Sequence, residues 1–174
     1  LHDEHQSLRD GSYFLRTFSP VRDNNDSRKI FAVAVVSKDI TKRRKTEEAL
    51  QKSELKYRQL IEHSSEAIFI LTGGKITFCN GRTEKMLGYP SEELRMISFI
   101  NLAISEDREM VFECQKAILQ GDPSSPTYSF RMINKEGMTF WVEINSVAIA
   151  WEGEPATLNF MRDITRQKKT EARL

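Results

Sequence analysis

One stretch of sequence occurs twice in this chain, and it constrains the fold more than any other feature. Lys38–Leu50 contains Asp-Ile-Thr followed by basic and then acidic residues, and Arg162–Leu174 repeats this order about 124 residues later. A period of this length is far longer than that of stacked solenoid repeats, and it indicates tandem domains. We therefore expect the end of one module, a charged connector, a complete second module and the start of another connector.

The repeat extends upstream into a turn and the strand that follows it. Asp10-Gly11 with Tyr13-Phe14-Leu15 is similar to Glu136-Gly137 with Thr139-Phe140-Trp141. This alignment equates Tyr13 with Thr139 and requires a small difference in length between the two copies. We place that difference in the turn-rich loop Asp23–Ser27, because insertions in loops cost little.

Composition excludes several classes of function. The formal net charge is +1, from 26 Lys and Arg against 25 Asp and Glu, which argues against a strongly basic nucleic-acid-binding protein. No apolar run approaches the roughly 18 residues of a membrane span, so we expect no membrane contact. Cys79 and Cys114 form no CxxC pair, and reduced thiols are typical of a cytoplasmic protein. Because the sequence starts at Leu1 without a signal segment, we expect a piece of a longer protein.

A long helix is predicted over 41–64, where Gly and Pro are absent and Lys, Glu, Gln, Leu and Ala are frequent. Its apolar residues follow the helical period, but the heptad pattern is interrupted at Ser53 or Glu54. We therefore expect only a weak coiled-coil seam in this connector. The seam residues are Leu50, Tyr57, Leu60 and Ile61.

Short strands and helices are predicted in the rest of the chain. Two apolar runs, Ala67–Leu71 and Lys75–Cys79, flank Gly73-Gly74 and indicate a hairpin. Helices are expected at 82–87 before Gly88, at 90–94 with Ser91 as N-cap, and at 105–119 with Ser105 as cap. Strands follow at 127–133, 140–146 and 156–164. This order predicts an α+β fold, a five-stranded antiparallel sheet with short helices on one face.

The order of these elements resembles the PAS domain, of the sensory-box type that occurs in tandem in signalling kinases. Each matching segment is short, and their joint order across residues 57–165 makes the resemblance specific. The segments are Tyr57–Glu62, Ala67–Leu71, Asn80 with Glu84–Tyr89, Ser105–Arg108, Asn134–Gly137 with Phe140–Glu143, and Arg162–Thr165.

The resemblance implies a non-catalytic sensory or relay module that couples a ligand or a redox state in its core to an output helix. An enzyme finds no support, because no phosphate-binding loop, carboxylate pair or activated nucleophile is evident. The alternative is a ligand-free scaffold that transmits conformational signals between tandem PAS domains. Either way the resemblance implies an effector domain in the same parent chain, such as a histidine kinase.

The resemblance also implies boundaries and contacts. Residues 1–41 are expected to be the three C-terminal strands of a preceding, partial PAS domain, followed by a connector helix at 42–64. A complete PAS domain at 65–165 and the start of an output helix at 166–174 follow. We expect a homodimer through the connector helix and the outer sheet face. A second subunit should also cover the apolar face of the first strands, formed by Phe14, Phe18, Phe31, Val33 and Val35.

Strand alternation and the geometry of the family together predict a candidate ligand pocket. Asn159 and Met161 should point inward, and Leu158 and Phe160 outward. The predicted residues are mostly apolar with a few polar atoms, which suits a small apolar ligand and equally suits an ordinary filled core. They are Phe78, Phe99, Met110, Cys114, Phe130, Met132, Val142, Ile144, Ser146, Asn159 and Met161.

The residues that relatives use for haem and flavin are missing. Haem-binding relatives place an axial His on the long helix, and residues 105–119 contain none. Flavin-binding relatives carry Asn-Cys-Arg-Phe-Leu-Gln after the second strand, whereas here Cys79 precedes Asn80 and Gly81 follows it. Met161 also stands where those relatives have Gln. We therefore expect neither haem nor flavin and leave the cofactor unidentified. The scattered histidines predict no metal site.

The repeated strand-to-helix junctions form a second candidate site, made by Asp39, Ile40 and Thr41 and again by Asp163, Ile164 and Thr165. We expect Asp163 to cap the exit helix through the amide of Thr165 or Arg166. Whatever fixes this junction also couples the strand to the helix.

Two further interpretations concern polar residues near the helices. Asn80 is expected to cap the helix that follows it. The basic clusters Lys42–Lys45 and Arg166–Lys169 are each followed by acidic residues at helical spacing. We interpret them as solvated helix faces, not as nucleic-acid-binding sites.

Overall fold

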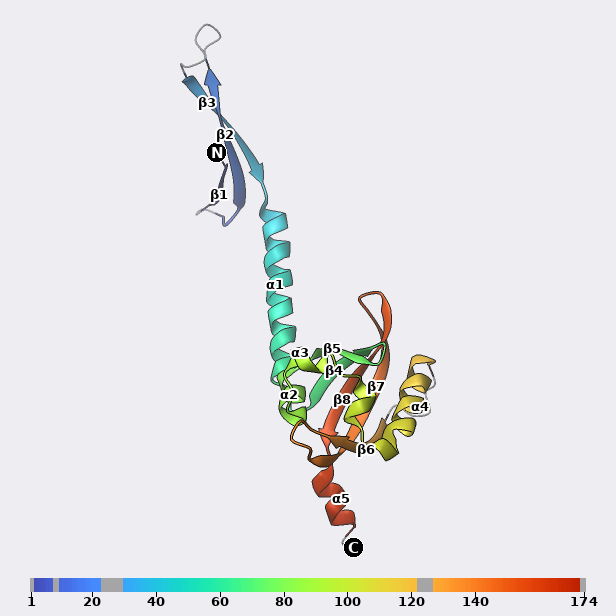
Figure 1. The fold of residues 1–174 in the computed structure, drawn as a ribbon. Coiled ribbons are helices and arrows are strands. Elements are labelled where there is room, and N and C mark those ends of the chain that lie inside the picture. The colour runs from blue at the N-terminus through green and yellow to red at the C-terminus, as the bar shows by residue number, and fades with distance from the viewer. Residues whose placement is uncertain (1, 8–9, 23–29, 122–126, 173–174) are drawn as a thin grey trace. The chain divides into compact units, whose positions relative to one another are not determined.

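The computed structural model describes the chain except for residues 1, 8–9, 23–29, 122–126 and 173–174 (Figure 1). The loop Asp23–Ser27, where we placed the length difference between the repeats, lies outside the described residues. The chain divides into two compact units, Leu1–Tyr57 and Arg58–Leu174.

The first unit contains a three-stranded antiparallel sheet in the order β1-β2-β3. The strands are β1 (His2–Gln6), β2 (Tyr13–Arg22) and β3 (Ile30–Asp39). Of the predicted apolar face, Val33 and Val35 are 57% and 52% exposed, and Phe14 and Phe18 are half-buried. The side chain of Phe31 is outside what the structure describes. That a second subunit covers this face stays a prediction.

Helix α1 (Thr41–Glu62) begins directly after β3 and ends two residues before the predicted limit. All of its residues are described, and none of them is buried. Leu50, Tyr57 and Leu60 of the predicted seam are 60–64% exposed, whereas Ile61 is half-buried. Most of the apolar stripe therefore faces solvent in the single chain.

The second unit is built on a five-stranded antiparallel sheet in the order β5-β4-β8-β7-β6. Its hairpin turns at Gly73 and Gly74, whose φ angles of 58° and 77° are unfavourable for other residues. The last strand in sequence, β8, lies in the centre of the sheet between β4 and β7. The strands are β4 (Ala67–Thr72), β5 (Lys75–Cys79), β6 (Thr127–Ile133), β7 (Thr139–Trp151) and β8 (Glu154–Asp163).

Short helices cover one face of this sheet, as Figure 1 shows. Leu87, Leu94 and Val111 from three different helices pack with Phe69 and Phe130 of the sheet in one buried cluster. This confirms the predicted α+β fold. The helices on this face are α2 (Gly81–Leu87), α3 (Ser91–Leu94), η1 (Phe99–Leu102), η2 (Ser105–Asp107) and α4 (Arg108–Leu119). Helix α5 (Thr165–Glu171) follows β8 and extends away from the sheet (Figure 1).

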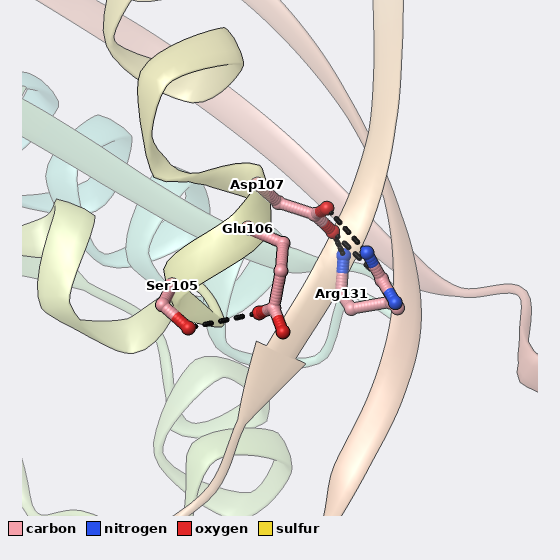
Figure 2. A network of polar contacts seen from close by, with 4 residues as sticks. All are labelled: Ser105, Glu106, Asp107 and Arg131. Carbon is pink, nitrogen blue, oxygen red and sulfur yellow. Dashed lines mark hydrogen bonds and ion pairs between the residues drawn. The ribbon is translucent and has the colours of Figure 1, made fainter.

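Two of the predicted helix caps are wrong. Helix α3 starts at Ser91 itself, and its N-cap is Pro90, which makes no side-chain cap bond. Ser105 begins the 3-10 turn η2, and its hydroxyl donates to the Glu106 carboxylate at 2.9 Å (Figure 2). A 3-10 turn in front of an α-helix carries the same residue pattern as a helical turn, so the pattern placed the start of the helix too early.

Candidate functional site

Most of the predicted pocket residues lie together in the interior of the second unit. Asn159 and Met161 point inward as expected, and Cys114 is half-buried against the same cluster. The residues that are at most 3% exposed are Phe99, Phe130, Met132, Val142, Ile144, Ser146, Asn159 and Met161.

Phe78 lies outside this interior, contrary to the prediction. A β-bulge between Ile70 and Leu71 shifts the register, so that Phe78 pairs with Ile70 and Cys79 pairs with the fully buried Phe69. A shift of one residue exchanges the two faces of a strand. Cys79 therefore packs against the core, and the Phe78 ring lies 6.1 Å from the ring of Trp151.

Met110 also lies elsewhere than predicted, because it is 39% exposed. The inward stripe of α4 runs through Val111, Gln115 and Ile118, at helical spacings of four and three residues. Met110 and Cys114 flank this stripe, with 3.8 Å between their sulfur atoms. A polar residue in the middle of the stripe was not predicted.

Gln115 connects α4 to the sheet through a network of buried polar side chains. Its Oε1 accepts a hydrogen bond from Thr157 Oγ1 at 2.9 Å, and its Nε2 donates to Asn159 Oδ1 at 3.3 Å and to Tyr128 Oη. Asn159 Oδ1 also accepts from Ser146 Oγ at 2.6 Å. Sequence reasoning found Ser146 and Asn159 but missed Gln115, Tyr128 and Thr157.

Burial holds one tyrosine and two cysteines of this unit in their neutral forms. Burial raises the pKa of the Tyr128 hydroxyl to about 12 and that of the Cys79 thiol to about 11. Burial also raises the pKa of Cys114. Both thiols therefore stay protonated at neutral pH, which makes them poor nucleophiles.

A cavity of about 530 Å³ opens beside the network, between α4, η1 and the turn that joins β4 to β5. Gln115 and Thr157 contribute polar atoms to its wall, and Leu71, Phe99 and Val111 contribute apolar surface. This volume is typical of sites for small molecules. Among the described residues of the predicted pocket, Phe99 alone lines the cavity. Most of the others are packed in a filled core, and Phe78 and Met110 lie outside that core.

The junction between β8 and α5 is held by side-chain and backbone bonds together. Asp163 Oδ1 accepts from the amide of Thr165 at 2.8 Å, which is the predicted contact, although the N-cap residue of α5 is Ile164. The amide of Ile164 donates to the carbonyl of Trp141 at 2.9 Å, and the amide of Trp141 donates to Thr165 Oγ1 at 2.9 Å. The start of the exit helix is thereby tied to β7, a neighbouring strand.

The junction between β3 and α1 has the same bonds. Asp39 Oδ1 accepts from the amide of Thr41, the amide of Ile40 donates to the carbonyl of Tyr13, and the amide of Tyr13 donates to Thr41 Oγ1, each at 2.8 Å. The two copies of Asp-Ile-Thr therefore build one local structure twice.

The hydrogen bonds correct the sequence alignment of the repeats. Tyr13 occupies the position of Trp141, not that of Thr139, because each contacts the helix junction of its own unit. Strand β2 begins at Tyr13 itself, whereas β7 begins upstream of Trp141. The similar residues of the two turns therefore lie at different distances from the junction.

We expect Thr165→Val to loosen α5 without unfolding the unit. Valine keeps the shape of threonine but leaves the Trp141 amide without its acceptor, a loss of about 1 kcal/mol. Amide hydrogen exchange within α5 should become about fivefold faster, while exchange in β4 should not change. Thr139→Val, at an exposed position of the same strand as Trp141, is the matched control. Unchanged exchange in α5 would contradict the role of this hydroxyl.

Asn80 joins three elements at the other end of the unit. It is fully buried, and its Oδ1 accepts from the amide of Thr83 at 3.1 Å, which confirms the predicted cap of α2. The same oxygen accepts from the amide of Ile68 at 3.0 Å. Its Nδ2 donates to the carbonyl of Ile61 at 2.9 Å and to that of Glu66 at 3.1 Å. Asn80 therefore ties the end of α1 to β4 and α2.

Glu62 adds a second bond at this end. Its Oε2 accepts from the amide of Gly81 at 3.0 Å. A side chain at Gly81 would point toward Glu62, since its Cβ would lie 3.3 Å from that oxygen. The position that follows Asn80 thus faces the end of α1.

Asp107 holds β6 against the start of α4, as Figure 2 shows. Its carboxylate contacts Arg131 three times, with Oδ1 2.7 Å from Nη2 and with Oδ2 3.0 Å from Nε and 2.7 Å from the backbone amide. The side chain of Asp107 is 13% exposed, and the bonds from Arg131 lower the pKa of its carboxyl. The pair is therefore ionised at neutral pH.

Two other kinds of site are absent from the described part of the chain. No cluster of His, Cys, Asp and Glu there could hold a metal ion. None of the described helices combines the length and the apolar character needed to cross a membrane.

The sheet order, the helices on one face and the strand-to-helix junction together define a PAS domain. Residues 76–159 match the family model of the PAS fold, and this part of the chain is a PAS domain. PAS domains are sensory modules, and the second unit is one of them.

Known proteins with similar sequences are signalling kinases. The chain is 29% identical over 140 residues to the blue-light-activated histidine kinases of Brucella ovis and Brucella melitensis. Each alignment covers 77% of this chain and 27% of the relative, so the chain spans about a quarter of the length of these relatives.

Solved structures show the same fold. The PAS domain of an HTR-like protein from Haloarcula marismortui is 25% identical with a TM-score of 0.57, over 70% of this chain and 99% of that one. A domain of a sensory box sensor histidine kinase/response regulator from Geobacter sulfurreducens is 23% identical with a TM-score of 0.56, over 66% and 96%.

Proposed function

We propose that the second unit is a non-catalytic sensory module that binds a small, mostly apolar molecule and passes its occupancy to α5. The cavity of about 530 Å³ beside Gln115 and Thr157 is the observation that carries this proposal. Its wall is apolar except for a few polar groups, which would orient a ligand that has one hydrogen-bonding end. Gln115 links this wall to the sheet, so a ligand that displaces α4 also disturbs the core network.

A flavin that forms a bond to cysteine does not fit these residues. The relatives in Brucella are named for activation by blue light, but here Gly81 follows Asn80 and faces Glu62. Cys79 is the nearest thiol in sequence, and burial raises its pKa to about 11. We therefore propose a different stimulus for this module.

The similar kinases support a parent chain with a kinase effector domain, because the aligned part is only 27% of their length. The absence of a disulfide between Cys79 and Cys114, which are both free thiols, supports a cytoplasmic location.

The cavity is tested with 1-anilinonaphthalene-8-sulfonate, whose fluorescence rises in apolar sites. We expect saturable binding to one site per chain, and native mass spectrometry of the purified chain should show any molecule that co-purifies. Ile100→Trp, which fills the cavity wall, should weaken dye binding about tenfold or more. Met96→Trp, at a position 78% exposed and away from the cavity, is the matched control. Equal dye binding in both variants would exclude this cavity as the site.

A second candidate function is a ligand-free scaffold that dimerises. The exposed Leu50, Tyr57 and Leu60 on α1 favour it, since an apolar stripe on a helix is a typical surface for a second helix. Dye binding and sedimentation of the intact chain together separate the two proposals. A ligand-free scaffold requires a dimer that Leu60→Glu disrupts and no saturable dye binding, whereas the sensory module requires saturable dye binding.

A further inference from the structure

Several hydrogen bonds join the start of α4 to Arg131 of β6. Besides the carboxylate of Asp107, the amide of Ile104 donates to the carbonyl of Arg131 at 3.0 Å. Bidentate pairs between arginine and a carboxylate fix both distance and orientation. Any displacement of the first turn of α4, which belongs to the helix that walls the cavity, is therefore shared by the Arg131 guanidinium (Figure 2).

Arg131 and a cation of the exit helix approach the same aromatic ring. Trp141 is the cross-strand partner of Arg131, and the guanidinium carbon lies 5.5 Å from the centroid of its ring. Lys168 Nζ, on α5, lies 5.8 Å from a Trp141 ring as well. Cations at such distances are attracted by the π-electrons of an indole.

The charges at this ring depend on Asp107. The Arg131 charge is offset by the Asp107 carboxylate, and Lys168 lies 3.4 Å from Glu171. If Asp107 releases Arg131, the full guanidinium charge competes with Lys168 for the same indole and repels it. The contact between Lys168 and Trp141 then weakens, and the first turns of α5 loosen.

We propose that Trp141 is a positioning residue that couples α4 to the output helix α5 through Asp107, Arg131 and Lys168. The inference deepens the proposed function and rests on it in one respect, namely that occupancy of the cavity moves α4. It adds a side-chain route to the backbone bonds that already join Trp141 to the Asp-Ile-Thr junction.

The route is tested by a double-mutant cycle on the intact chain without added ligand, read by amide hydrogen exchange. Asp107→Asn should speed exchange of the α5 amides about threefold in the parent background. In a Lys168→Met background the same change should have an effect below about 1.5-fold, because the competing contact is gone. Amides of β4 report global unfolding. Within each background, Asp107→Asn should leave the exchange rate of these amides unchanged.

Two further variants separate the indole from a general packing role. Trp141→Phe keeps a π face and should retain most of the coupling, whereas Trp141→Leu keeps apolar bulk and should abolish it. Equal effects of Asp107→Asn in the parent, Lys168→Met and Trp141→Leu backgrounds would overturn the proposal. The cycle uses no ligand, so its failure would not affect the dye-binding test of the cavity. A failure of the dye-binding test would likewise not affect the result of the cycle.

A similar cluster elsewhere in the unit supplies the control. Lys135 Nζ lies 2.6 Å from Glu93 and 5.4 Å from the centroid of the Tyr89 ring, so it is also a cation between a carboxylate and an aromatic ring. Glu93→Gln makes the same chemical change as Asp107→Asn but touches no residue of α5. It should leave exchange of the α5 amides unchanged, and an equal acceleration would contradict the specific route.

Discussion

An Asn80→Ala variant should lose about 3 to 5 kcal/mol of unfolding free energy, a large share of the stability of a small domain. The change removes a fully buried amide, leaves the amide of Ile68 without this acceptor, and leaves the amide of Thr83 with only the backbone carbonyl of residue 80. It also takes the amide donor away from the carbonyl of Glu66 and removes the shorter of two donors from the carbonyl of Ile61. Each buried polar group that loses its partner costs about 1 to 3 kcal/mol, and water can reach some of them. Urea unfolding followed by tryptophan fluorescence measures the loss.

An Asn80→Asp variant tests the oxygen and the nitrogen of the Asn80 amide separately. Asn80→Asp keeps an oxygen for Ile68 and Thr83 but places a second oxygen against the carbonyls of Ile61 and Glu66. We expect it to be destabilised at least as strongly as Asn80→Ala at neutral pH. If it were as stable as the parent chain, the proposed tie between the end of α1 and the sheet would be wrong.

Asn159→Ala should cost about 2 to 4 kcal/mol, and it should loosen α4 as well as the sheet. Asn159 is fully buried, and its Nδ2 donates to the carbonyl and the hydroxyl of Thr157 at 2.9 and 3.0 Å. Without it, Ser146 loses its acceptor and Gln115 loses one of its bonds to the sheet. Thermal unfolding gives the global effect, and amide exchange in α4 should accelerate more than exchange in β4.

Asn145→Ala is the matched control for both asparagines. Asn145 stands on β7 with an exposed side chain that makes one bond, to Thr127 Oγ1 at 3.2 Å. Its removal should change stability by less than about 0.5 kcal/mol. Asn159→Leu adds a test at nearly constant volume, because it removes the polar partner without opening a cavity. A leucine variant more stable than the parent would show that the network does not hold α4.

The parts of the fold that local chemistry determines were predictable. Gly88 ends α2 with a φ of 75°, Asp163 accepts from the amide of Thr165 two residues later, and Asn80 caps α2. These contacts join neighbours in sequence, so residue type and spacing are sufficient to indicate them. The apolar runs predicted the positions of the strands for the same reason.

Other features depend on residues that are distant in sequence. The bulge at Thr77 of β5 decides whether Phe78 or Cys79 faces the core, and no residue in the hairpin marks it. Gln115 was missed because the prediction sought an apolar stripe on α4, although it lies between Val111 and Ile118 at helical spacing. Its partners Tyr128 and Thr157 come from β6 and β8, whose pairing with α4 is not encoded locally.

The hydrogen bonds that hold the two Asp-Ile-Thr junctions use only backbone atoms of the neighbouring strand. Tyr13 and Trp141 can therefore differ while the amide and carbonyl at their position make the same bonds. A junction of this kind is interchangeable between units whose sheets have diverged. Recombination of genes at these codons would preserve the start of the helix, so that new sensory units could be exchanged in evolution without redesign of the connection that follows them.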